Sequence, residues 1–185
     1  MERSFRDSIF TVISAMTSTG YTISDYMYWP VVAWVVIFFL MLTGACAGST
    51  GGGIKVSRIL ILFKSIRREI KLAAHPKATH KITMNSKSAD EGTVRSVCVY
   101  FGVFMALFAL SVLIISFDNF DPTTNFTAVA ATVNNVGPGL SLVGPTRNYA
   151  EFSNLSKIVL SLDMLIGRLE IFPMVMLLSP YTWKK

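Results

Sequence analysis

Two short glycine-containing segments carry the residues best suited to chemistry in this sequence. The first turn is Thr17, Ser18, Thr19 and Gly20, and the second turn is Asn134, Asn135, Val136 and Gly137. Backbone carbonyl oxygens in such a turn can replace the hydration shell of a potassium ion, and glycine permits the dihedral angles that aim them. One such segment alone reads as an ordinary surface turn. Two in the same setting favour a pair of ion-filter segments.

Apolar helices must position these turns. The chain of 185 residues is 52% hydrophobic and only 15% charged, which is typical of an integral membrane protein. Uncharged runs at residues 29–47 and 97–117 each approach the roughly 20 residues that a spanning helix requires. A third run, residues 155–178, contains Asp163, Arg168 and Glu170, whose charges should face the protein interior.

The segments that precede the turns, residues 8–16 and 124–133, are too short to span a bilayer. Non-helical backbone inside a membrane is tolerated only where protein buries it or where it lines a water-filled path. We therefore expect two re-entrant pore loops, each made of a short helix and the turn that follows it.

Basic residues predict the orientation. More than half of the seventeen Lys and Arg residues lie between Lys55 and Arg95, which indicates a cytoplasmic linker, and the C-terminal Lys184 and Lys185 agree with it. Both turns then open to the outside, where acidic residues would concentrate cations: Asp25, Asp118, Asp121 and Glu151. For the linker itself we expect contact with anionic lipid rather than nucleic acid.

The order of the elements repeats along the chain. Residues 93–185 contain a spanning helix, a pore helix, a turn and a second span, whereas residues 1–72 have the same order without the opening helix. Residues 73–92 form the basic linker between them. Similar segments at residues 41–44 and 164–167 support a duplication. We predict an all-α membrane protein of helix–pore loop–helix repeats with re-entrant filter loops, as in potassium channels, present as about one and a half repeats.

A glycine-rich run follows the first long apolar segment. This glycine loop is Gly48, Ser49, Thr50, Gly51, Gly52 and Gly53. Each glycine costs about 1 kcal/mol relative to alanine inside a helix, so the helix should break here and resume over residues 54–72. A mobile loop beneath a pore is the favoured interpretation, and a passive kink is the alternative.

Phosphate binding is a further alternative for the glycine loop. The run nearly matches the phosphate-binding pattern G-x-x-x-x-G-K-[ST], but Ile54 separates Gly53 from Lys55, and Val56 stands where Ser or Thr is needed. Such a loop should also follow a buried strand rather than a helix. A membrane-bound nucleotide-dependent component is therefore the weaker functional hypothesis. Because the sequence has no convincing catalytic triad, paired histidine ligands or paired catalytic carboxylates, we predict no catalytic residue, no enzyme activity and no organic cofactor.

Arg168 needs partners, because an arginine at the centre of a membrane helix costs at least about 2.5 to 3.5 kcal/mol. The favoured partners are the carbonyls and hydroxyls that the helix break exposes at Gly48, Ser49 and Thr50. A static buried ion pair with Asp163 is the alternative.

Together, both turns, the run of residues 47–55 and the segment of residues 167–170 resemble the Trk/Ktr family of bacterial potassium uptake proteins, most closely the TrkH type. The resemblance covers nearly the whole chain and corresponds to the C-terminal half of such a protein: part of repeat three and all of repeat four. It implies transport of potassium or another monovalent cation, with the ion bound only at the two turns. It also implies an intramembrane gating loop at residues 48–53, with Arg168 beside it.

The resemblance further implies a location and partners. The chain would be a multi-pass protein of the bacterial inner membrane, with residues 73–92 and the C-terminus in the cytoplasm. Its partners would be membrane lipid, the missing N-terminal repeats, a second copy in a homodimer, and a cytoplasmic nucleotide-binding regulatory subunit of the TrkA type. An inactive fragment of such a transporter is the alternative.

Overall fold

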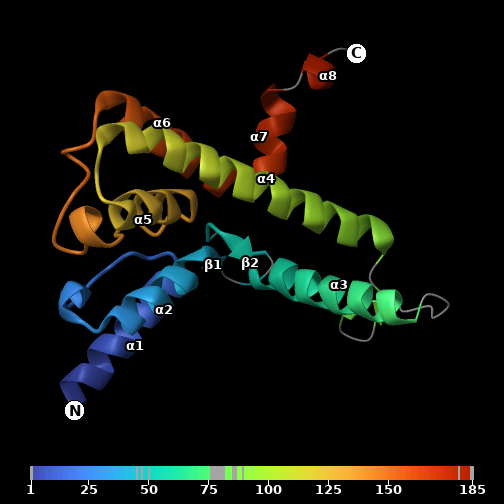
Figure 1. The fold of residues 1–185 in the computed structure, drawn as a ribbon, viewed down its shortest axis with the longest axis horizontal. Helices are drawn as coiled ribbons and strands as arrows, with labels where there is room; N and C mark the ends of the chain where they lie inside the picture. Colours follow the sequence, from blue (N-terminus) through green and yellow to red (C-terminus); the bar gives the residue numbers. More distant parts are fainter. Residues whose placement is uncertain are drawn as a thin grey trace.

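The computed structural model describes residues 2–44, 46, 48–49, 51–75, 82–84, 87–88, 90–178 and 180–183. The described chain is helical, with two pairs of very short strands (Figure 1). The first half contains α1 (Glu2–Met16), η1 (Tyr26–Tyr28), α2 (Val31–Leu42), β1 (Thr43–Gly44), β2 (Ile54–Lys55), α3 (Val56–Ala74), β3 (Thr83–Met84) and β4 (Lys87–Ser88). The second half contains α4 (Glu91–Ile115), η2 (Ser116–Asp118), α5 (Pro122–Val133), η3 (Ser141–Val143), α6 (Asn154–Leu169), α7 (Ile171–Leu178) and α8 (Pro180–Trp183).

Helix α5 lies below α4 and α6 at the left of Figure 1 and contacts both. It begins after Asp121, whose Oδ2 accepts a hydrogen bond from the backbone N–H of Thr124 at 3.0 Å, and Pro122 suits the first helical position. Ala128, Val129 and Ala130 are completely buried. Residues 127–133 of α5 are all buried, so the C-terminal end of the helix, and the second turn that follows, lie in the interior of the protein.

Helix α4 supplies the long scaffold. Among the described residues, the stretch Glu91–Asp118 is the one helix that is long and apolar enough to cross a membrane. Large apolar side chains face outward from it, as Leu113 at 67% exposure illustrates, and Val32 of α2 is 75% exposed. Such uncovered apolar surface suits a lipid environment or further protein.

The first long apolar run forms a shorter helix than predicted. Helix α2 ends at Leu42 instead of reaching residue 47, because Thr43 and Gly44 are extended and pair in parallel with Ile54 and Lys55. The pairing joins the two sides of the glycine loop, so the break begins before the glycines themselves. Figure 1 places this strand pair at the junction between α2 and α3.

The run at residues 155–178 is likewise two helices rather than one. Glu170 adopts a left-handed φ of +62° between α6 and α7. Its carboxylate lies 2.9 Å from Nη2 of Arg58 on α3, so a contact distant in sequence accompanies the break. The prediction of one continuous span was wrong at this position.

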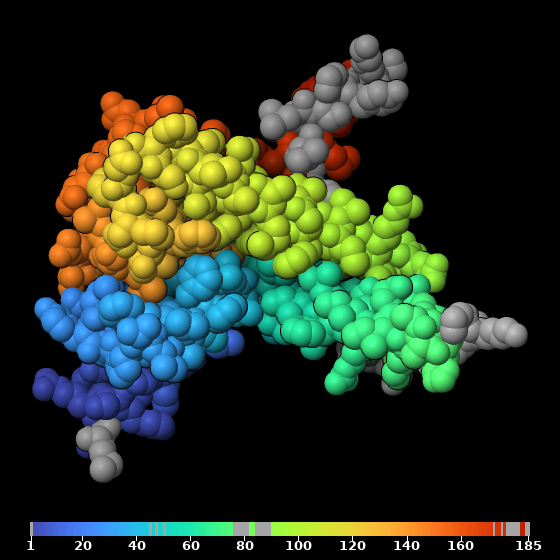
Figure 2. Space-filling model, in the orientation of Figure 1, coloured from blue at the N-terminus to red at the C-terminus, as the bar shows by residue number. Residues whose placement is uncertain are grey.

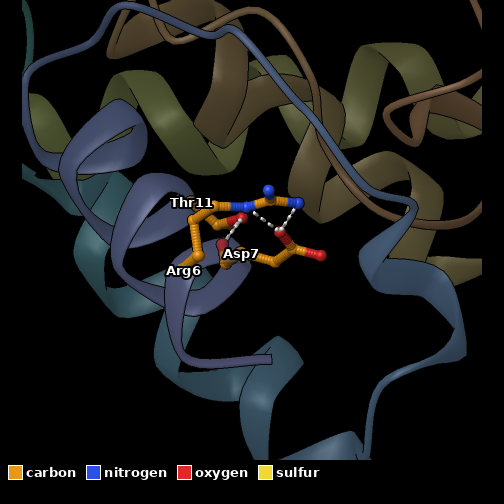
Figure 3. A network of polar contacts seen from close by, with 3 residues as sticks. All are labelled: Arg6, Asp7 and Thr11. Atoms are coloured by element: carbon orange, nitrogen blue, oxygen red, sulfur yellow. Dashed lines mark hydrogen bonds and ion pairs between the residues drawn. The ribbon is translucent and has the colours of Figure 1, made fainter. Parts of the chain in front are cut away.

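Helix α1 packs against α2 and carries local polar contacts near its start. Both Nε and Nη2 of Arg6 lie 3.2 Å from Oδ1 of Asp7, while Oγ1 of Thr11 donates to the Asp7 carbonyl at 2.8 Å (Figure 3). Figure 2 shows the α1–α2 hairpin pressed against the part of the chain that carries α5. The hairpin thereby brings the first turn next to the second.

Candidate functional site

The two turns have the same backbone shape. Ser18 and Gly20 have φ of +54° and +75°, and Asn135 and Gly137 have φ of +55° and +102°. The second and fourth residues of each turn are therefore left-handed. The shared pattern aligns the two turns residue by residue, as expected of a duplicated element.

The hydrogen bonds of the turns also match. Thr19 N donates to Ser14 O at 3.0 Å, and Val136 N donates to Ala131 O at 2.8 Å, each bond reaching five residues back into the preceding helix. Both bonds fix the third residue of a turn onto the end of its helix.

The first residue of each turn bonds its own helix through a different side chain. Oγ1 of Thr17 donates to Ile13 O, and Nδ2 of Asn134 donates to Ala130 O, both at 2.7 Å. A threonine hydroxyl and an asparagine amide thus donate to the equivalent carbonyl, four residues earlier in the preceding helix. The two turns can therefore differ in sequence and still have the same backbone shape.

After the second turn the chain doubles back along α5. The backbone N–H of Leu140 donates to Oγ1 of Thr127 at 3.0 Å, and the N–H of Leu142 donates to Oγ1 of Thr124 at 3.3 Å. The return path therefore ends near the start of the helix. A short helix, a turn and an antiparallel return form the shape that a pore loop requires.

The two turns lie side by side. A Cβ atom placed on Gly20 would lie 2.0 Å from the carbonyl oxygen of Val136 and 3.2 Å from Cδ of Pro138. The hydroxyl of Tyr26, which follows the first turn, donates to Gly139 O at 2.8 Å. Segments more than a hundred residues apart in sequence thus form one structural unit.

Tyrosine and serine hydroxyls hold the backbone at and just after the C-terminal ends of the turns, which the sequence did not reveal. Tyr149 donates to Gly137 O at 2.7 Å, and Oγ of Ser14 donates to Tyr21 O at 2.7 Å. The Gly137 carbonyl is thus engaged by protein.

The glycine loop contacts the second turn. A Cβ on Gly52 would lie 2.3 Å from the carbonyl oxygen of Asn134, and a Cβ on Gly53 would lie 2.6 Å from Oδ1 of the same residue. The Asn134 side chain is fully buried. Gly48, in contrast, has a φ of +86° with no neighbouring atom within 4 Å of its Cβ position. Thr50 lies outside the described residues.

Lys55 turns back onto the glycine loop. Its Nζ donates to Ser49 O at 2.7 Å and also to Gly51 O, and the residue is only 6% exposed. An amine directed at the carbonyls of its own loop does not have the geometry of a phosphate-binding lysine, which points at a ligand. The described structure therefore lends no support to the nucleotide-binding alternative.

Arg168 lies in the last turn of α6 and is exposed in the chain. Its positive charge, like that of Arg58, opposes the charge of Lys55, whereas Glu170 favours it. Asp163, the alternative partner, is 3% exposed and its Oδ1 accepts a hydrogen bond from Ser111 at 2.8 Å.

Residues next to Arg168 and Asp163 anchor α6 against the second turn. Nδ2 of Asn135 donates to Met164 O at 3.1 Å. A Cβ on Gly167 would lie 1.8 Å from the carbonyl oxygen of Val133, so only glycine fits at this crossing. Helix α6 therefore supports the turn through its backbone.

The acidic residue that caps the N-terminus of α5, Asp121, is held ionised. Partial burial raises the pKa of the Asp121 carboxyl, but hydrogen bonds from Thr124 and Ser141 outweigh that effect and leave the pKa below its ordinary value. Within the described ranges, no group of three or more His, Cys, Asp or Glu side chains could hold a metal ion. Besides the backbone, the polar groups of the two turns are the hydroxyls of Thr17, Ser18 and Thr19 and the amides of Asn134 and Asn135.

Comparison with known proteins gives a consistent match. The family model described as "Cation transport protein", TrkH, matches residues 1–184. The Trk system potassium uptake protein TrkH of Salmonella typhimurium is 37% identical over 178 residues, which cover 96% of this chain and 36% of that protein. The Trk system potassium uptake protein TrkG of Escherichia coli is 33% identical over 98% of this chain and 37% of its own length.

A solved structure matches the fold as well. The crystal structure of the potassium transporter TrkH from Vibrio parahaemolyticus superimposes with a TM-score of 0.88 at 35% identity, covering 99% of this chain and 39% of that chain. The described fold is thus that of an all-α membrane transporter. This chain spans little more than a third of the length of the relatives it matches.

Proposed function

This chain belongs to the TrkH family of cation transport proteins, and on that premise we propose that it forms part of a potassium pore in a bacterial inner membrane. The observation that carries the proposal is the contact between the two matching turns, where Gly20 lies against the carbonyl oxygen of Val136. Carbonyl filters require such segments side by side around one ion path. Two turns of equal shape, brought together from distant parts of the chain, support that arrangement.

In this proposal potassium is the transported ion and is bound by the protein only at the turns. Backbone carbonyls contact it at Thr17, Ser18, Thr19, Gly20, Asn134, Asn135 and Val136. Gly137 belongs to the same filter through its backbone shape, because its own carbonyl accepts a hydrogen bond from Tyr149. No organic cofactor takes part.

The repeat architecture is also part of the proposal. Residues 93–185 form a complete helix–pore loop–helix unit, residues 1–72 form the pore loop and broken second helix of another, and residues 73–92 link them. The return of the chain along α5 supports a re-entrant loop. Because a filter ring of this type uses four segments, the remaining two would come from further repeats of the transporter.

Residues 48–53 act as the gate below the filter. The close approach of Gly52 to the Asn134 carbonyl supports a loop placed directly against the second turn. Arg168 is the proposed partner of the loop in the closed state, and its electrostatic action on Lys55 supports a position nearby.

The proposal extends to orientation and partners. The basic helix α3, with Lys64, Arg67 and Lys71, would face the cytoplasm and contact anionic lipid. The C-terminus would lie on the same side. Partners would be a second copy of the transporter and a nucleotide-binding regulatory subunit of the TrkA type. Most of the linker and the C-terminal Lys184 and Lys185 lie outside the described residues.

The test is reconstitution into liposomes, with potassium and sodium uptake measured separately. The chain is inserted alone and, in parallel, together with the part of a TrkH relative that it does not cover. We expect potassium uptake to exceed sodium uptake when the missing part is present. Uptake only in the combined sample would identify the chain as a fragment that cannot conduct alone. No uptake in either sample, with both proteins folded, would contradict the proposal.

A further inference from the structure

Lys55 is a charged residue whose side chain forms hydrogen bonds with the backbone of the glycine loop. It ends β2, directly before α3, and its side chain reaches back so that Nζ donates to the carbonyls of Ser49, at 2.7 Å, and Gly51. Its backbone is fixed on the other side of the loop by the parallel pairing with Gly44. The side chain therefore spans the loop from its base to its middle.

The loop carbonyls are the main compensation for the charge of Lys55. The residue is 6% exposed, and a buried ammonium group is costly unless polar partners replace its hydration. The charged groups that act on it are Glu170, Arg58 and Arg168, of which only Glu170 is attractive. Glu170 is already paired with Arg58 at 2.9 Å. If the loop carbonyls moved away, the Lys55 ammonium group would lose both hydrogen-bond acceptors and would still be opposed by the charges of Arg58 and Arg168.

The same bonds fix the part of the loop that meets the second turn. Gly51, whose carbonyl accepts from Lys55, immediately precedes Gly52, and Gly52 lies against the Asn134 carbonyl. A constraint on Gly51 is transmitted directly to its neighbour through the planar peptide unit.

We propose that Lys55 is the positioning residue of the glycine loop: its ammonium group holds the Ser49 and Gly51 carbonyls and thereby keeps Gly52 against Asn134. The gating consequence rests on the function proposed above. If residues 48–53 close the ion path, release of Lys55 from these carbonyls accompanies opening. Before that release, the ammonium group acts as a tethered monovalent cation, bound by backbone carbonyls of the kind that a potassium ion would meet in the filter.

The experiment follows loop order and ion flux in the same protein. Cys46, an exposed free cysteine two residues before the glycine loop, receives a nitroxide spin label after Cys98→Ala removes the other thiol. Lys55→Met keeps the length of the side chain and removes its charge. Lys157→Met is the matched control, because the Lys157 ammonium also donates to a backbone carbonyl, that of Ala150 at 2.8 Å, but does so on the exposed side of α6.

We expect Lys55→Met to lose the immobilised component of the spin-label spectrum, and Lys157→Met to retain it. Lys55→Arg, which keeps charged donors, should restore part of that component. An unchanged spectrum in Lys55→Met would overturn the proposal. Should Lys55→Met fail to fold, Lys55→Gln serves as the uncharged variant, and equal spectra for Lys55→Gln and Lys55→Arg would overturn it. A loosened loop without increased potassium flux would uphold Lys55 as the positioning residue and contradict the gating function instead.

Discussion

Gly20 and Val136 lie in direct backbone contact, so close that a Cβ atom on Gly20 would lie 2.0 Å from the carbonyl oxygen of Val136. Each residue belongs to one of two turns with the same pattern of left-handed positions. The backbone of one turn therefore limits the positions open to the other. Substitutions in the two turns should consequently have coupled rather than independent effects.

This contact predicts a difference between two glycine-to-alanine variants. Gly137→Ala should destabilise the fold by about 1 to 3 kcal/mol, because alanine is strained at a φ of +102° although nothing lies within 4 Å of its Cβ. Gly20→Ala should cost more, since the same kind of strain is combined with a clash against backbone. Denaturant unfolding in detergent measures both.

Gly102→Ala is the control for that pair. Gly102 lies within α4 with open space around its Cβ position, so alanine should be neutral or stabilising by up to about 1 kcal/mol. Equal destabilisation by Gly20→Ala and Gly137→Ala would show that the contact with Val136 adds nothing to the cost of a side chain at Gly20.

A second pair of glycines tests the gate. Gly52→Ala should push the glycine loop away from the Asn134 carbonyl, which lies 2.3 Å from the added Cβ, and so raise basal potassium flux. Gly102→Ala, which adds a Cβ in open space on α4 without a positive φ, should leave that contact in place. Flux into liposomes is compared for the two variants, each combined with the missing part of a relative. Equal flux in both would mean that the contact does not restrict the ion path.

Arg168→Ala should increase cation flux while the protein still folds, because it removes a positive charge that the proposed function places below the filter. Flux and thermal stability are measured together. If Arg168 were instead a static partner of Asp163, expression would be lost, and the additional change Asp163→Asn would partly restore it. The hydrogen bond from Ser111 gives Asp163 a partner that does not depend on Arg168.

Asp121→Ala should destabilise the fold by about 1 kcal/mol, because α5 loses its N-terminal capping carboxylate. The pKa of Asp121 is lower in the folded chain than its ordinary value, so its contribution is complete above about pH 4 and is lost as the pH falls through the folded pKa. The free energy of unfolding should therefore differ less between pH 7 and a pH below 3 in the variant than in the unchanged chain. An identical pH dependence in both proteins would exclude Asp121 as a source of the pH-dependent stability.

Local signals were sufficient to predict α5 and its turn. The predicted segment, residues 124–133, ends at the observed residue, where the Asn-Asn-Val-Gly segment begins, and starts two residues late because the capping residue Asp121 and the N-terminal Pro122 were not used as a start signal. The glycine loop was likewise evident, because glycines that cannot continue a helix are visible in the sequence itself.

The errors arose where distant residues decide the structure. The end of α2 depends on the pairing of Thr43 with Ile54, and the break at Glu170 is accompanied by its ion pair with Arg58. Neither contact leaves a periodic pattern near the affected residue. The bonds from Lys55 to its own loop escaped notice for a related reason: a lysine after a glycine run suggests a phosphate site, and only the folded geometry shows its real acceptors.

The most direct measurement is the potassium-to-sodium uptake ratio of Gly137→Ser, compared with Gly102→Ser, in liposomes that contain this chain and the missing part of a relative. Serine at Gly137 distorts a turn whose carbonyls should contact the ion, whereas serine at Gly102 lies on a helix away from the turns. A carbonyl filter predicts a reduced ratio for Gly137→Ser and an unchanged ratio for Gly102→Ser. An unchanged ratio for Gly137→Ser, with potassium uptake intact, would contradict the assignment of the turns as the filter.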